Sequence, residues 1–157
     1  MAELGKKKIV ASEDNWFLLR GDVFHDVLSK RPHDLATITP EKVQGFTLLG
    51  GDLGTVGSKI CWHYTHDGKD RVAKEIIQDI NEEKKSIVFK MIEGDLMELY
   101  KTFTIMYHVD VLGDEESLIT WTLDYEKLKE DTPHPGTFLN LLLHAVEDIE
   151  SHHIKNA

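Results

Sequence analysis

One acidic residue in a mostly apolar predicted strand is the strongest candidate for chemistry in this sequence. Glu75 has an alanine two positions before it and an isoleucine two positions after it. If its side chain points inward, burial raises the pKa of the carboxyl and makes it usable as a general acid or base. An enzyme would then need Tyr64 or Tyr107 as the proton donor. The alternative is a surface carboxylate beside Lys74, and the local pattern alone favours that surface position.

Two other features suggest chemistry at first sight. The run from Gly50 to Ser58 is rich in glycine, but it has no lysine before its serine and lacks the G-x-G-x-x-G spacing. It also leads into a strand, whereas a phosphate-binding loop leads into a helix. We therefore expect a structural connection. The lone Cys61 has no recognisable histidine partner, so packing is favoured over a nucleophilic role.

Nine histidines raise the possibility of a metal site. His63 and His66 are three residues apart on a predicted strand, which places them on opposite faces. His152 and His153 lie close to the C-terminus. None of these pairs has the spacing of a zinc site, so we expect no metal and no cofactor.

Composition and charge restrict the class of partner. The chain has 157 residues and 18 Lys plus Arg against 28 Asp plus Glu, giving a formal net charge of −10. This charge disfavours nucleic-acid binding and ribonuclease activity, and the three lysines at residues 6–8 are expected to be a solvated edge. One cysteine suits a reducing compartment. With no signal-peptide pattern and no membrane span in the sequence, we expect one cytosolic domain over residues 1–157.

The elements that must position these residues follow from the turns. Short breaks rich in Gly, Asp, Asn and Glu separate apolar alternating runs, which predict strands over residues 58–66, 69–80, 85–93, 97–112 and 117–128. Two earlier strands are expected over 8–19 and 43–49. Connections this short require antiparallel neighbours.

Three helices are expected around these strands. Apolar residues at spacings of three and four predict a long amphipathic helix over residues 135–154. Two short helices, over 22–30 and 33–38, follow the first strand. The order is that of an α+β fold.

This order predicts an internal cavity. Seven strands at about 4.8 Å make a sheet about 33 Å wide, whereas one helix is only about 10–12 Å across. The sheet must therefore curl around the helix, and two short helices close one end without filling the hollow. A solid aromatic core is the alternative, which the pattern does not exclude, and the geometry favours a pocket. Alternation places these aromatic residues on the inner face: Trp62, Tyr64, Phe89, Phe103, Tyr107, Trp121 and Tyr125.

Several motifs carry a resemblance to a known family. In order along the chain they are Arg31-Pro32-His33, Thr39-Pro40, Gln44-Gly45, Gly54-Thr55-Val56-Gly57-Ser58, Asp67-Gly68-Lys69, Glu93-Gly94-Asp95-Leu96-Met97, Tyr100-Lys101, Trp121-Thr122, Tyr125-Glu126-Lys127, Asp148-Ile149-Glu150 and His152-His153. In this order and spacing they resemble the major latex protein family, a plant branch of the birch pollen allergen and pathogenesis-related class 10 superfamily. The resemblance covers residues 20–154, and the first 19 residues look longer and less typical.

The resemblance implies the helix-grip fold, with a seven-stranded curved antiparallel sheet around the long C-terminal helix. It also implies a cavity for a small hydrophobic ligand, such as a steroid, flavonoid, hormone or long-chain compound, and an association with plant defence or stress. By similarity, the cavity-facing strand positions are Trp62, Tyr64, Glu75, Phe89, Trp121, Leu123 and Tyr125, which moves Glu75 inside. Alternation adds Phe103, Tyr107, Leu139, Leu142 and Leu143.

The expected function is that of a carrier without catalysis. The alternative is an enzyme that condenses or isomerises plant metabolites with Glu75 as acid or base, since similar domains in some plants do so. Family relatives have a loop of similar role at Gly50 to Gly57, and here Asp52-Leu53 stand among its glycines. The sequence leaves open whether this loop gates the cavity, and it indicates neither the ligand nor the oligomeric state.

Overall fold

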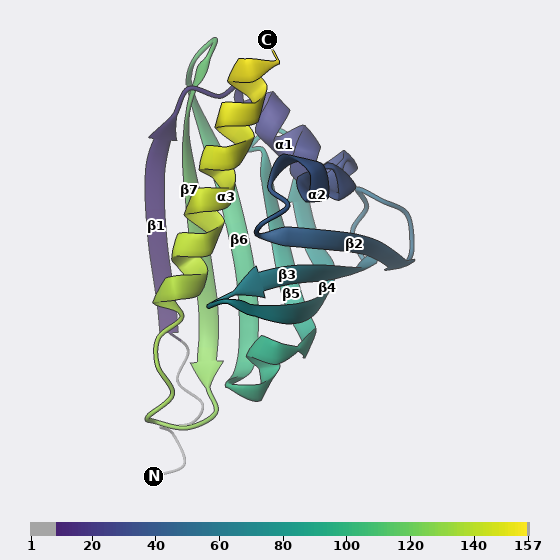
Figure 1. The fold of residues 1–157 in the computed structure, drawn as a ribbon, viewed down its shortest axis with the longest axis vertical. Helices are drawn as coiled ribbons and strands as arrows, with labels where there is room; N and C mark the ends of the chain where they lie inside the picture. The colour runs from purple at the N-terminus through teal and green to yellow at the C-terminus, as the bar shows by residue number, and fades with distance from the viewer. Residues whose placement is uncertain (1–8, 157) are drawn as a thin grey trace.

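The computed structural model describes residues 9–156, and its elements alternate as the turns predict (Figure 1). The lysines at 6–8, including the expected start of the first strand at Lys8, lie outside the described residues. The elements are β1 (Ile9–Phe17), α1 (Gly21–Lys30), η2 (Pro32–Asp34), α2 (Leu35–Ile38), β2 (Val43–Gly50), β3 (Lys59–His66), β4 (Lys69–Asn81), β5 (Ser86–Gly94), η3 (Asp95–Glu98), β6 (Tyr100–Gly113), β7 (Glu116–Lys127) and α3 (Gly136–Lys155).

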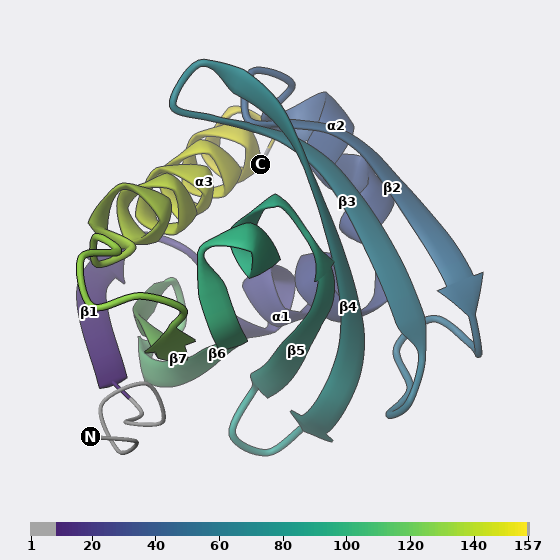
Figure 2. The same ribbon diagram turned by 90° about the horizontal axis from the view of Figure 1, so that it is seen from below.

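All seven strands form one sheet in the order β1-β7-β6-β5-β4-β3-β2. Every neighbouring pair is antiparallel. Figure 2 shows the sheet curving strongly, with α3 along the open side of the curve and α1 and α2 at one end. The predicted helix-grip architecture is confirmed.

The alternation on β7 shows how the sheet separates its two faces. Ile119, Trp121, Leu123 and Tyr125 are all buried on the concave face, whereas the residues between them are half-buried on the other face. Apolar side chains every second residue place one face of a strand against the core. This is why the inner face of β7 could be predicted from the sequence.

Strand β4 is less regular because two register shifts interrupt its pairing with β5. They fall between Lys74 and Glu75 and between Ile77 and Asp79. Alternation survives the first shift, but after the second shift the inner position passes to Ile80, which pairs with Ile87 and packs against the core. Ala73, Glu75 and Ile77 are the buried residues of this strand. The uncertain start of its inner face is thereby assigned to Ala73, not to Val72.

One predicted boundary is wrong. The strand expected from residue 97 begins at Tyr100, and η3 occupies Asp95–Glu98 instead. The reversal is tied locally, because Asp95 Oδ1 accepts a hydrogen bond from the backbone N–H of Val72 at 2.8 Å. A carboxylate that holds a backbone donor in this way favours a turn over a continued strand.

Helix α3 packs its apolar side against the concave face of the sheet. Phe138, Leu139, Val146 and Ile149 are buried, and the predicted span of 135–154 agrees within one residue at each end. Burial at spacings of three and four is the pattern of an amphipathic helix. Within the described residues, no helix combines the length and the apolar character that crossing a membrane requires.

Gly94 gives a test of the β5–η3 reversal. Its φ is +132°, and a Cβ built there would lie 2.2 Å from the carbonyl oxygen of Val72. Gly94→Ala is therefore expected to lower the free energy of unfolding by about 2–3 kcal/mol, measured by urea denaturation. Gly113→Ala is the control, because a Cβ there meets no atom within 4 Å. Equal stability of the two variants would contradict the steric argument.

Candidate functional site

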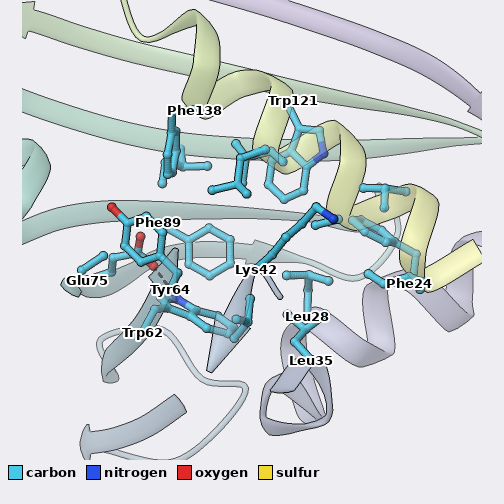
Figure 3. A pocket seen from close by; sticks show the side chains of 18 residues that line it. Phe24, Leu28, Leu35, Lys42, Trp62, Tyr64, Glu75, Phe89, Trp121 and Phe138 are labelled. Atoms are coloured by element: carbon cyan, nitrogen blue, oxygen red, sulfur yellow. Dashed lines mark hydrogen bonds between the residues drawn. The ribbon is translucent and has the colours of Figure 1, made fainter. Parts of the chain in front are cut away.

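A cavity lies between the concave face of the sheet, α3 and the two short helices (Figure 3). The cavity has a volume of about 100 Å³. The whole space between the lining side chains, including solvent at the mouth, is about 750 Å³. The sheet contributes Val43, Trp62, Tyr64, Ala73, Glu75, Phe89, Ile105 and Trp121, and the segment before β2 contributes Lys42. The helices contribute Phe24, Leu28, Leu35, Phe138, Leu141, Leu142, Ala145, Val146 and Ile149.

Half of the twelve predicted site residues lie in this lining. They are Trp62, Tyr64, Glu75, Phe89, Trp121 and Leu142. The other six lie outside it, namely Phe103, Tyr107, Leu123, Tyr125, Leu139 and Leu143. All but Leu143 are buried, and Leu143 is partly buried against the same core. The prediction that they line the cavity is therefore not supported by the geometry.

The solid part of the core explains why some inward-facing residues miss the cavity. The rings of Phe103 and Tyr125 stack with centroids 6.0 Å apart, and Phe103 meets Phe138 edge to face at 5.7 Å. Tyr100 packs against both Phe103 and Tyr125. Aromatic rings at these distances pack favourably and leave little space between them. The cavity and the solid aromatic core, weighed as alternatives from the sequence, therefore occupy different parts of one hollow.

Glu75 is the carboxyl group in the sheet wall of the cavity. Its side chain is 3% exposed, and its Oε1 accepts a hydrogen bond from Trp62 Nε1–H at 3.0 Å (Figure 3). Burial raises the pKa of this carboxyl to about 8, although the hydrogen bond from Trp62 acts in the opposite direction. At neutral pH the carboxyl is therefore mostly protonated. The surface position favoured by the local pattern is wrong, and the inward position implied by the resemblance matches the structure.

Lys74, the charged neighbour that favoured a surface position for Glu75, lies on the other face of the sheet. Lys74 points away from the cavity and its Nζ lies 3.2 Å from Glu93 Oε2 on β5. Consecutive residues of a strand point to opposite faces, so a charged neighbour says little about Glu75.

Tyr107 is not available as the proton donor for Glu75. A hydrogen bond of 2.7 Å joins its Oη to His25 Nδ1, and His25 Nε2 lies 3.1 Å from Glu82 Oε2. This network leads from the core to the surface at α1. Tyr64, the other tyrosine considered from the sequence, does line the cavity, and burial raises its pKa above the ordinary value.

Sequence reasoning missed the residues that close the cavity from the two short helices. Phe24, Leu28 and Leu35 come from the short helices, which were expected only to cap one end. Their apolar spacing shows that they face inward, but only the fold shows what they face.

Lys42 is the least expected lining residue. Its Nζ lies 2.6 Å from Asp148 Oδ2 on α3, and Thr39 Oγ1 donates to the same oxygen at 2.7 Å. These contacts hold α3 to the segment that leads into β2. A lysine just before a strand carries no signal of such a role.

The remaining candidates for chemistry fall elsewhere. Cys61 is buried and burial raises the pKa of its thiol, which is opposite to the activation of a nucleophile. Across residues 9–156, no three metal-ligating side chains lie close enough together to hold a metal ion.

The glycine-rich loop packs near α1, since a Cβ at Gly54 would lie 3.1 Å from the carbonyl oxygen of Ser29. No residue from 50 to 57 belongs to the cavity lining.

Comparisons with known proteins agree with this architecture. MLP-like protein 31 of Arabidopsis thaliana is 42% identical over 130 residues, which cover 82% of this chain and 76% of that protein. The crystal structure of ginseng major latex-like protein 151 from Panax ginseng superposes with a TM-score of 0.89 at 42% identity, covering 93% of this chain and 97% of that one.

A more distant structure shares the fold alone. It is that of norcoclaurine synthase from Thalictrum flavum, with 18% identity, a TM-score of 0.71 and coverage of 94% of this chain and 88% of that one. Residues 19–156 match the Pathogenesis-related protein Bet v 1 family. This family is known for binding hydrophobic ligands. The chain belongs to the Pathogenesis-related protein Bet v 1 family, and its relatives at about 40% identity are major latex proteins.

Proposed function

We propose that this protein binds and carries a small hydrophobic ligand in the cavity between the sheet and α3. The observation that carries the proposal is an unfilled, almost wholly apolar space in a core that is otherwise packed with aromatic rings. Each 100 Å² of apolar ligand surface removed from water contributes about 2.5 kcal/mol, less the cost of immobilising the ligand. Binding of this kind requires no catalytic group.

The proposed ligand classes are steroids, flavonoids, hormones and long-chain compounds. The cavity volume of about 100 Å³ is comparable to that of an engineered cavity of about 150 Å³ that binds benzene. A larger ligand must therefore displace side chains. Lys42, Trp62, Leu141, Leu142 and Ala145 line the cavity and are only half-buried, so this edge has the most freedom to move.

The biological setting is proposed from the relatives and from the thiol. A family of pathogenesis-related proteins supports a role in plant defence or stress. A single free cysteine suits the reducing environment of the cytosol. The charge of −10 continues to argue against a nucleic-acid partner.

A second candidate function is acid–base catalysis on a bound metabolite, and Glu75 is the observation that favours it. A carboxyl with a pKa of about 8 inside an apolar cavity is poised to exchange protons near neutral pH. Tyr64 is the nearby hydroxyl in the lining. A condensation or isomerisation would suit this pair, although a single carboxyl bonded only to an indole N–H is a weaker arrangement than a catalytic dyad.

Filling the cavity should remove ligand binding. Ala145 lies on the cavity side of α3, so Ala145→Phe would place a ring in the space that a ligand needs. We expect at least one saturable ligand for the wild-type protein from a panel of plant steroids, flavonoids and fatty acids, and affinity at least tenfold weaker for the variant, both by isothermal titration. Ala36→Phe is the matched control because Ala36 is not in the lining. A silent panel, or equal binding by both variants, would contradict a carrier function.

Glu75 should make stability fall as the pH rises. The carboxyl has its ordinary pKa of 4.5 in the unfolded chain and a pKa of about 8 in the folded protein. Between these pH values the folded state therefore holds one more proton than the unfolded state. The free energy of unfolding therefore decreases with pH over this window, by up to about 1.4 kcal/mol per pH unit. Glu75→Gln removes this contribution, and urea denaturation at pH 5, 6.5 and 8.5 should show the variant gaining on the wild-type protein at each step. Glu98→Gln, at an exposed carboxyl, is the control, and its free energy of unfolding should change with pH as that of the wild-type protein does. If Glu75→Gln also changes with pH as the wild type does, Glu75 is ionised in the folded protein and the prediction is wrong.

The catalytic alternative makes a separate prediction. If Glu75 moves the proton, Glu75→Gln should abolish turnover of a bound metabolite while its affinity stays within about threefold. Mass spectrometry of reaction mixtures measures the first quantity and titration measures the second. Undiminished turnover in the variant would exclude Glu75, and no turnover by the wild-type protein on any ligand that it binds would leave only the carrier function.

A further inference from the structure

Large apolar side chains are exposed at the end of the sheet where β1 ends. Trp16 is 48% exposed and Leu18 is 46% exposed. Leu112, in the hairpin that joins β6 to β7, is 54% exposed. Figure 1 shows this hairpin extending beyond β1 at the same end of the molecule. Single exposed apolar residues are normal on a protein surface, whereas a group of them marks an interaction site.

The strand pairing places these side chains next to one another. Trp16 pairs with Leu118 on β7, and Leu118 pairs in turn with Asp110 on β6. Ile119 faces the core, so Leu118 and its partner Trp16 face outward. Leu112 lies two residues after Asp110. The group, which we call the apolar end, consists of Trp16, Leu18, Leu112 and Leu118.

Acidic side chains surround the apolar end. Asp14 and Asp110 are exposed and lie on the same outward face, because each is an even number of residues from a position in the row of Trp16 or belongs to that row. The hairpin turn adds three exposed acids at residues 114–116. Arg20, which follows β1, already pairs with Asp22 at 2.8 Å. The surface around the apolar end is therefore strongly negative.

Basic residues border this surface on the side away from β1. The backbone N–H of Val109 donates to the carbonyl oxygen of Lys84 at 3.5 Å, which places the β4–β5 hairpin beside the far edge of β6. His108 faces outward near the same edge, and its Nε2 lies 3.5 Å from Asp110 Oδ2. The acidic surface is thus limited to β1, β7 and the hairpin turn.

Charge restricts what can dock on the apolar end. Nucleic acids and anionic membranes carry the same sign of charge and would be repelled. A second copy of this chain, docked through the same surface, would set one group of acids against the other. A helix with an apolar face and flanking Lys or Arg side chains would instead cover the apolar residues and pair with the acids around them.

We infer that the apolar end is a docking surface for a basic amphipathic helix of another protein, with Trp16 as its central contact. Tryptophan is among the residues that contribute most to protein–protein binding energy. Neither Trp16 nor its neighbours in the apolar end belong to the cavity lining. The surface is therefore separate from the proposed ligand site, and ligand binding and partner binding are tested independently.

Two peptides of identical composition separate amphipathic docking from simple charge attraction. Both contain only Leu and Lys and have about 14 residues, or about four helical turns. In one peptide the leucines recur at spacings of three and four, and in the other their order is scrambled. By isothermal titration in about 50 mM salt, the amphipathic peptide should bind saturably and the scrambled one at least about tenfold more weakly. Equal binding would show that charge alone attracts the peptides and would overturn the inference.

Trp16 reports where the peptide binds, because neither peptide contains an aromatic residue. Burial of its ring should shift the tryptophan emission to shorter wavelength, and Trp16→Phe should remove this shift. Trp16→Ala should weaken the amphipathic peptide at least about tenfold. Leu99→Ala is the matched control, since Leu99 is 45% exposed and lies before β6, at the opposite end from the hairpin. Equal loss in both variants, or no loss in either, would overturn the inference.

The acids are tested by two triple variants that remove the same charge. Asp114→Asn, Glu115→Gln and Glu116→Gln together should weaken the amphipathic peptide about three- to tenfold and reduce its dependence on salt. The control removes three exposed acids elsewhere, by Asp70→Asn, Glu98→Gln and Glu130→Gln. Equal weakening in the two triple variants would assign the effect to net charge and would contradict a local acidic surface.

Two further measurements test the occupants that the charge argument excludes. Light scattering over a range of protein concentrations should show no association that Trp16→Ala abolishes. Vesicles of phosphatidylcholine should leave the tryptophan emission unchanged. Association lost in Trp16→Ala would assign the surface to a second copy of this chain, and an emission shift with vesicles would assign it to a membrane. Either result would overturn the inference.

Discussion

The sheet offers more concave surface than one helix can cover, and the rest of the structure depends on how side chains occupy the difference. Seven antiparallel strands curve around α3, which lies along the open side of the curved sheet (Figure 2). Where Phe103 and Tyr125 stack beside Phe138, aromatic rings fill the space between sheet and helix. Between β3, β4 and the short helices, the lining side chains do not meet, and a cavity remains. One architecture therefore provides both a packed core and an internal cavity.

Polar groups in the cavity wall are the exceptions to this packing, and they concentrate the functional interest. Burying Glu75 opposes folding wherever its carboxyl would ionise in water, and the single hydrogen bond from Trp62 offsets only part of that cost. Tyr64 and Trp121 add unpaired donors in the same wall. A purely structural core would gain stability by replacing such groups with apolar ones. Burying these groups among the lining residues therefore costs stability that packing alone does not explain.

The cavity wall is held firmly on some sides and loosely on another. Tyr107 packs against Phe24 and Trp121 and is tied by its hydroxyl to His25, which supports the wall from behind. The edge between α3 and β2 instead relies on the partly exposed pair of Lys42 and Asp148. Lys42 is 20% exposed and Asp148 is 36% exposed, so solvent screens this pair in part, and this edge is less rigidly packed than the aromatic wall. Any expansion of the cavity is most easily accommodated there.

The sequence by itself determined the order of elements, the antiparallel pairing and the inner face of β7, because these depend on local turns and on strict alternation along one strand. It also identified the family through motifs such as Glu93-Gly94-Asp95-Leu96-Met97. Only the tertiary structure decided which inward residues meet empty space: Phe89 and Trp121 line the cavity, whereas Phe103 and Tyr125 pack against each other. Lys42 entered the lining through its contact with α3, more than a hundred residues away. Alternation reports the direction of a side chain, whereas a cavity depends on the volume left between side chains from distant segments, and that volume exists only once the chain has folded.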